Sequence, residues 1–261
     1  MPVETGTAPT ASRIGPRAPW IWMYHSVDDA TCDPYGITVE PDRLEHQMNW
    51  LRRRGLRGVG VAELLRALAT GRGDDLVGLT FDDGYADFAA HALPVLQHHG
   101  FTATVFVLAR RLDGTNTWDP LGPRKRLLSG DGVRSVAAAG MEIGSHGLRH
   151  TDLTRLSPAD LRSEVLDSRT ILSRVTNQPL QGFCYPYGRL DERTVQAVSL
   201  AGYQYACAIS PDPPHGLLAL PRVHISQADR SWRLHVKHLL HHAPRCIGTS
   251  RPAPTSERVS E

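Results

Sequence analysis

The chain has 261 residues, an apolar fraction of 41% and a formal net charge of +2 at pH 7, which suits one large domain or two small ones. Apart from short runs such as "LRRRG" and "PRKR", its basic residues are scattered, so it lacks the basic stripe of a nucleic-acid-binding protein. It contains no run of about 18 apolar residues, which excludes a membrane-spanning helix.

Both ends of the chain are predicted to be tails. Residues 1–18 are rich in Pro, Thr and Ala and lack the apolar segment of a signal peptide, while residues 243–261 are polar and rich in Pro and Ser. We therefore expect a flexible N-terminal tail, one domain over 19–242 and a disordered C-terminal tail. Without a signal peptide, the expected location is the cytoplasm.

The cysteines indicate neither a zinc ribbon nor a disulfide framework. The four residues, Cys32, Cys184, Cys207 and Cys246, are widely spaced and include no CxxC pair. Reduced thiols are the expected state.

Between the tails, strand-like and helix-like segments alternate. In chain order the predicted elements are a strand at 21–27, helices at 40–55 and 61–71, a strand at 76–81, a helix at 87–100, a strand at 102–109, a helix at 133–140, a strand at 141–145, a helix at 157–175, a strand from 182, a helix at 191–202, strands at 204–210 and 220–226, and a helix at 231–242.

Two of these helices carry clear terminal signals. Ser157 is a predicted cap for the helix that Pro158 opens, and Asp160 lies where a capping-box acid belongs. Pro94 predicts a kink within the helix that Gly100 ends.

The alternation repeats about seven times, which predicts a parallel sheet with helices outside it, either closed as a barrel or open and doubly wound. No GxGxxG follows a strand, so a dinucleotide-binding fold is not favoured. A single domain is the simplest division.

Polar side chains gather where the predicted strands end, which is the edge of a barrel that carries the chemistry. These residues are His25, Asp82 and Asp83, His146 and His150, Tyr185 and Tyr187, and Arg222 and His224.

His146, His150 and one of the two aspartates form a set of two imidazoles and one carboxylate. Three protein ligands and an open position are the usual form of a catalytic zinc site. The other aspartate is then free to act as a base. Taken alone, "DDG" is more often a turn and an HxxxH pair is a weak signal; the joint placement at separate strand ends favours a metal site.

These motifs resemble the polysaccharide deacetylase family, the NodB homology domain of carbohydrate esterase family 4. "LTFDDGY", "SHGLRH" and "FCYPYG" are similar to its first three motifs, and the resemblance extends from "MYHSV" to "LPRVHI". It implies a distorted (β/α) barrel, related to the TIM barrel, with about seven strands in a single domain.

The resemblance also implies a role for each residue. Asp82 matches the catalytic base, and Asp83, His146 and His150 match the metal ligands. The backbone N–H of Tyr187 matches the oxyanion donor, with Tyr185 beside it.

Two positions depart from the family pattern. Many members carry an Arg in the third motif that steadies the base, where this chain has Cys184, and Arg222 is the expected substitute. For the general acid, His224 is the first candidate and His25 the second.

The implied activity is metal-dependent removal of the N-acetyl group from a sugar or glycan precursor, with release of acetate. The expected cofactor is one divalent ion, first Zn²⁺, with Co²⁺, Ni²⁺ or Mn²⁺ as alternatives. The expected partner is an N-acetylated carbohydrate, on which Tyr85, Trp118 and Tyr187 could stack. An amidohydrolase acting on a non-sugar amide and a non-catalytic carbohydrate-binding protein are the competing interpretations. Asp152 and Glu142 are candidates for supporting the histidine ligands.

Overall fold

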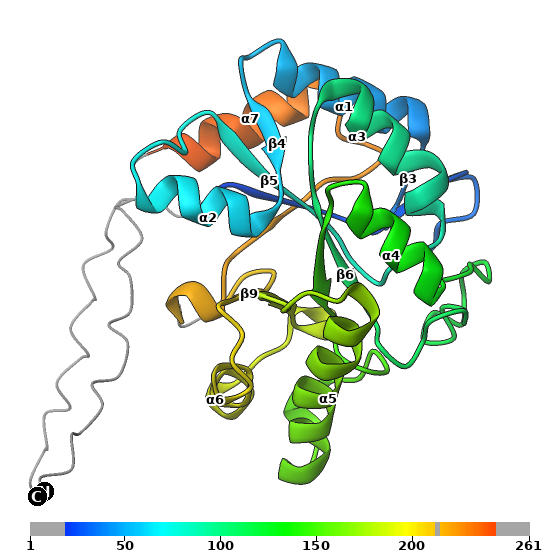
Figure 1. Ribbon diagram of the computed structural model, residues 1–261. Helices are drawn as coiled ribbons and strands as arrows, with labels where there is room; N and C mark the ends of the chain where they lie inside the picture. Colours follow the sequence, from blue (N-terminus) through cyan, green and yellow to red (C-terminus); the bar gives the residue numbers. More distant parts are fainter. Residues whose placement is uncertain (1–18, 212–214, 244–261) are drawn as a thin grey trace, which may run out of the picture.

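The computed structural model describes residues 19–211 and 215–243 (Figure 1). Apart from Ala243, the two predicted tails lie outside the described residues, and so does Cys246.

A parallel sheet forms the centre of the molecule. Its strands are β1 (Ile21–Tyr24), β4 (Arg57–Val59), β5 (Leu76–Phe81), β6 (Thr104–Val107), β7 (Glu142–Ser145), β8 (Gly182–Cys184), β9 (Tyr205–Cys207) and β10 (Val223–His224). Seven of them follow one another in the order β10-β1-β5-β6-β7-β8-β9, and β4 pairs with the first half of β5. A short second pair joins β2 (Ser26–Val27) to β3 (Thr38–Val39).

The strand order follows the chain without the reversal of a doubly wound sheet, so the sheet curls into a barrel. The segment 220–224 connects the two edges of the sheet. Leu220 bridges to Cys207 of β9, and Val223 pairs with Trp22 of β1. The prediction of a distorted barrel of about seven strands is confirmed.

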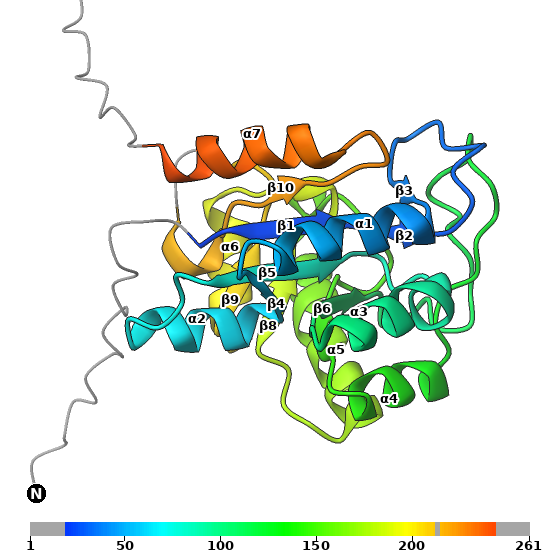
Figure 2. The same cartoon turned by 90° about the horizontal axis from the view of Figure 1, so that it is seen from above.

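Helices surround the strands (Figures 1 and 2). They are α1 (Pro41–Arg52), α2 (Val61–Ala69), α3 (Leu93–His99), α4 (Gly130–Ala138), α5 (Pro158–Thr176), α6 (Glu192–Leu200) and α7 (Ser231–His242), with a π-helix η1 (Phe88–Ala92) and 3₁₀ turns η2 (Leu153–Arg155), η3 (Pro186–Gly188) and η4 (Gly216–Leu218). In both views α1 and α3 lie side by side.

Local sequence explains the best-predicted helix. The Ser157 hydroxyl accepts a hydrogen bond from the Asp160 backbone N–H, and Leu161, Val165 and Leu172 are buried along one face of α5. The cap and the apolar stripe agree, which is why this helix could be read from the sequence.

Several elements differ from their predictions. The expected strand at 21–27 breaks at His25, after which β2 pairs with β3. The helix at 87–100 begins as the π-helix η1, because Pro94 cannot donate the backbone hydrogen bond of a regular α-turn. The strands β3 and β4 were not predicted, since two or three residues are too short to show alternation.

Within the described residues no helix is both long and apolar enough to cross a membrane. Cys32, Cys184 and Cys207 are free thiols, as expected for that part of the chain.

Candidate active site

Asp82 and Asp83 lie directly after β5, at the edge where the parallel strands end. The backbone N–H of Asp82 donates to the carbonyl of Tyr24 on the neighbouring strand, 3.0 Å away, which fixes the start of the turn. Asp83 follows with a φ of 69°, and both side chains are buried, with about 3% of their surface exposed. The turn therefore buries two adjacent carboxylates that point toward different partners.

Asp83 meets the two histidines of the "SHGLRH" motif. Its Oδ1 atom lies 3.3 Å from Nε2 of His146 and 3.3 Å from Nε2 of His150. This Oδ1 is buried and has no hydrogen-bond partner. A carboxylate oxygen and two imidazole nitrogens that converge in this way are the donor set of a divalent transition-metal site. The residues present therefore fit the ion that the family resemblance implies.

Other residues hold this cluster in place. Nδ1 of His146 contacts the carbonyl oxygen of Cys184 at 2.9 Å, which orients Nε2 toward Asp83. Glu164, buried on α5, accepts a hydrogen bond from the Leu148 backbone N–H at 2.7 Å, between the two histidines. The role of Glu164 was not predicted from the sequence, although a carboxylate on the apolar face of a helix is a visible signal.

Neither of the acids expected to support the histidines does so. Asp152 pairs with Arg189 at 2.7 Å, and Glu142 accepts a hydrogen bond from the hydroxyl of Tyr205 at 2.7 Å. Nearness in sequence was misleading, because Glu142 lies at the start of β7, away from the edge at which His146 emerges.

Burial and charge set the protonation states of the cluster. Burial lowers the pKa of His150 to about 4, so its imidazole is neutral at pH 7, the form that binds metal. Burial alone would raise the pKa of Asp83, but the neighbouring histidines outweigh it and lower that pKa. The pKa of His146 is raised despite burial, because Asp83 and Asp82 stabilise its charged form.

Backbone strain is concentrated at these residues. Among the described residues, five that are not glycine have a positive φ, and three of them are Asp83, His150 and Tyr187. Such a backbone costs a bulky residue energy and persists where the surrounding structure demands it.

Asp82 has a different partner. Arg222, just before β10, donates from Nη1 to Oδ1 at 2.7 Å and from Nη2 to Oδ2 at 2.8 Å. The same Nη2 lies 3.1 Å from Sγ of Cys184. Burial opposes ionisation of Asp82, but the charge and hydrogen bonds of Arg222 outweigh it and hold the pKa of this carboxyl well below its usual range. The arginine thus makes the contact expected of it in place of the missing third-motif Arg.

The two candidate acids lie at different distances from the carboxylates. Nε2 of His25 is 3.9 Å from Oδ2 of Asp82, and its side chain is 18% exposed. The ring of His224 lies beside that of His25, with centroids 6.4 Å apart. Burial, together with the charges of His25 and Lys237, lowers the pKa of His224. His25 is therefore the histidine that directly faces Asp82.

Two aromatic rings flank the cluster. Trp118 stacks on the ring of His150, with centroids 4.7 Å apart, and the ring of Tyr187, 48% exposed, meets that of His150 edge to face, with centroids 4.4 Å apart. Tyr85 and Tyr185 are buried and donate their hydroxyls to Asp119 and to the carbonyl of Leu218. Their side chains thus belong to the core, whereas Trp118 and Tyr187 border the histidine cluster.

Comparisons with known proteins agree with the motifs. A sequence profile described as polysaccharide deacetylase matches residues 70–206, just over half of the chain. The chain is 29% identical over 211 residues to the Bacillus subtilis protein named "Putative polysaccharide deacetylase YxkH", covering 79% of this chain and 71% of that protein. It is 32% identical over 128 residues to the chitooligosaccharide deacetylase of Bradyrhizobium, covering 48% of this chain and 52% of that one.

Among solved structures, the Streptococcus pyogenes deacetylase PplD in complex with acetate is similar, with a TM-score of 0.70 and 25% sequence identity. The alignment covers 84% of this chain and 97% of PplD. The polysaccharide deacetylase BC0361 of Bacillus cereus shares the fold, with a TM-score of 0.72 over 84% of this chain and 68% of that one, at 23% identity.

Proposed function

Because the chain belongs to the polysaccharide deacetylase family, we propose that it hydrolyses the acetamide of an N-acetylated sugar, with a divalent metal ion, and releases acetate and a free amino sugar. The observation that carries this proposal is the pair of adjacent carboxylates, one facing His146 and His150 and the other held by Arg222.

Asp83, His146 and His150 would hold the ion, for which Zn²⁺ is the first choice and Co²⁺, Ni²⁺ and Mn²⁺ are alternatives. When bound, such an ion supplies Lewis-acid polarisation of the carbonyl and lowers the pKa of water. Neutral His150 is already in the form that this role requires.

Asp82 is the proposed base. Arg222 occupies one lone pair on each oxygen of Asp82, and Oδ2 also accepts a weak hydrogen bond from Sγ of Cys184 at 3.6 Å. Oδ1 therefore keeps a lone pair for the proton of the attacking water. The ion pair also keeps the carboxylate ionised in a buried setting, which is the form that a general base must have before the reaction.

Two further groups complete the proposed reaction. The backbone N–H of Tyr187 would stabilise the oxyanion that forms when water oxygen attacks the acetyl carbon, a contribution of roughly 3–4 kcal/mol for one good donor. As the C–N bond breaks, the leaving nitrogen needs a proton. The distance of 3.9 Å to Asp82 favours His25 over His224 as its source.

The names of relatives support a carbohydrate substrate. A protein of Escherichia coli named poly-beta-1,6-N-acetyl-D-glucosamine N-deacetylase is 30% identical over 131 residues, which is 47% of this chain and 20% of that protein. The half-buried ring of Trp118 and the exposed ring of Tyr187, both beside His150, are suited to stacking on a sugar.

The test is acetate release from N-acetylated glucosamine oligomers by chelated protein, with and without Zn²⁺ or Co²⁺ added back. We expect release only with metal. O-acetylated sugars and acetylated non-sugar amides serve as controls for the bond and the substrate. Release from the non-sugar amides alone would contradict the carbohydrate assignment, and release by the chelated protein would contradict the role of the metal.

A further inference from the structure

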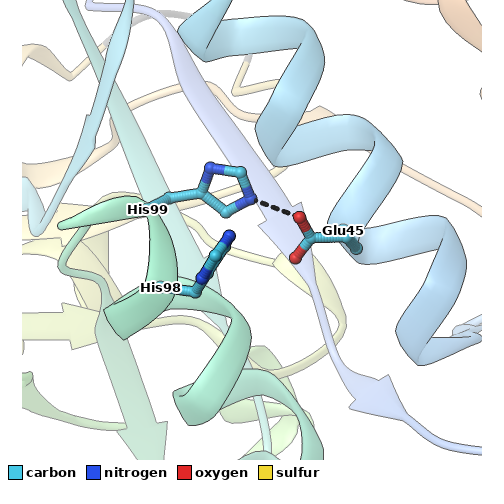
Figure 3. A group of neighbouring side chains, drawn as sticks. All are labelled: Glu45, His98 and His99. Atoms are coloured by element: carbon cyan, nitrogen blue, oxygen red, sulfur yellow. Dashed lines mark hydrogen bonds and ion pairs between the residues drawn. The ribbon is translucent and has the colours of Figure 1, made fainter.

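A second group of metal-binding side chains lies between α1 and α3, away from the active site. Figure 3 shows Glu45 of α1 with His98 and His99 of α3, the two rings and the carboxylate turned toward one another. One nitrogen or carboxylate oxygen from each residue lies within 4.8 Å of those from the other two.

The position of this group separates it from the catalytic residues. The α3 helix returns from the end of β5 to the start of β6, so its last residues lie at the end of the barrel where the strands begin. Asp82, Asp83 and His146 lie at the opposite end, where the strands finish. An ion bound at one end therefore shares no ligand with the other.

Two of the three side chains already contact each other. The side chain of His99 has no exposed surface, and its Nε2 atom contacts Oε1 of Glu45 at 2.9 Å. The ring of His98 is exposed and stands nearly perpendicular to that of His99, with centroids 5.1 Å apart. One fixed imidazole, one carboxylate and one ring that can turn on the surface offer three ligands and leave room for water.

We propose that Glu45, His98 and His99 form a second binding site for a divalent transition-metal ion of the zinc class. Two imidazoles and one carboxylate suit Zn²⁺, Co²⁺, Ni²⁺ or Cu²⁺ rather than Mg²⁺ or Ca²⁺. The buried Nδ1 of His99 has no hydrogen-bond partner, so the site lacks the outer contact that strengthens a histidine ligand. Its ion is therefore weakly held and exchangeable, and it ties α1 to α3.

The experiment counts zinc bound to the full-length, untagged protein by equilibrium dialysis. His98→Asn and Glu45→Gln remove ligands from this group alone. His46→Asn is the matched control, because His46 is an exposed histidine on the same helix whose Nδ1 contacts the carbonyl of Asp42. We expect His98→Asn and Glu45→Gln each to bind one ion fewer than the wild type, His46→Asn to bind the same number, and all three to keep their deacetylase activity.

A second measurement asks whether the ion links the two helices. Added Zn²⁺ should raise the unfolding temperature of the Asp83→Asn protein, and adding His98→Asn to that protein should abolish the increase.

An unchanged zinc count in both His98→Asn and Glu45→Gln would overturn the proposal. Because the zinc counts are compared between variants, the difference between them does not depend on whether the active site binds metal.

Discussion

Asp82 and Asp83 are neighbours in the chain and equally buried, yet they lie in opposite environments. Arg222 gives Asp82 two charged hydrogen bonds, whereas Asp83 faces two imidazole nitrogens and keeps a buried oxygen without a donor. The residue type is the same, and the partners decide the chemistry: a carboxylate already paired with a cation can act as a base, and one with an unfilled oxygen can bind a metal ion.

The largest effect on activity is expected for Asp83, the carboxylate of the pair that is proposed to bind the metal ion. Asp83→Asn should lose the active-site ion and reduce deacetylation to background, because it replaces the charged ligand that both histidines face. Metal analysis and acetate release measure the two losses. An Asp83→Asn protein that keeps a stoichiometric active-site ion would remove Asp83 from the ligand set.

Asp82→Asn should have the complementary effect. The ion should stay, while kcat should fall about 10²- to 10⁴-fold, the usual contribution of a general base. Metal content and steady-state kinetics, measured on the same preparation as Asp83→Asn, test the division of roles. Loss of the ion from Asp82→Asn would show that the two carboxylates share the site.

The two histidines near Asp82 provide the next test. His25→Asn should lower kcat roughly 10²-fold if His25 supplies the proton to the leaving amine. His224→Asn should cause a smaller loss, because His25 is the candidate that makes the 3.9 Å contact with Asp82. Substrates with an activated leaving group need no acid, so they should rescue His25→Asn. The reverse ranking of the two variants would make His224 the acid.

Arg222→Lys tests how Asp82 is positioned. Lysine keeps the charge but cannot make both hydrogen bonds of the guanidinium fork. We expect kcat to fall about tenfold, since one charged hydrogen bond is worth about 1.5 kcal/mol, while KM and metal content stay unchanged. A change in KM with kcat intact would place Arg222 in substrate binding instead.

The smallest effect on kinetics is expected for Trp118, which is not a partner of either carboxylate. Trp118→Leu removes a ring that stacks on His150 and is proposed to stack on the sugar. We expect KM to rise roughly 2- to 10-fold, in line with an aromatic contact worth about 0.5–1.5 kcal/mol. Titration with an unreactive glycan gives the same comparison without catalysis, and an unchanged affinity would assign Trp118 to support of His150 alone.

Much of the fold could be predicted because its signals are local. The apolar run at 76–81 became β5 without change, and α5 begins at Pro158 as its cap indicated. Elements shaped by tertiary contacts were not predictable in the same way. The break at His25 depends on the pairing of β2 with β3, which periodicity within one segment does not record.

The candidate site shows the same division. Strand ends and motif spacing predicted that His146, His150 and one of the two aspartates lie together, and the family resemblance singled out Asp83, which the structure places beside both histidines. The supports came from distant segments: Glu164 from α5 and the carbonyl of Cys184 from β8. Spacing along the chain carries no information about such contacts, which is why Asp152 and Glu142 were the wrong choices. The group of Glu45, His98 and His99 was not predicted, because the two histidines precede the helix-ending Gly100 and have no acid nearby in sequence, and Glu45 belongs to a different helix.

The pairing of Asp82 with Arg222 also has a consequence for biosynthesis. The two residues are 140 positions apart, so the carboxylate leaves the ribosome long before its guanidinium partner. Until β10 docks beside β1, the end of β5 would have to bury an unpaired charge, which is unfavourable. A nascent chain therefore forms the ion pair of its proposed base in the step that closes its barrel, and protein truncated before Arg222 has neither.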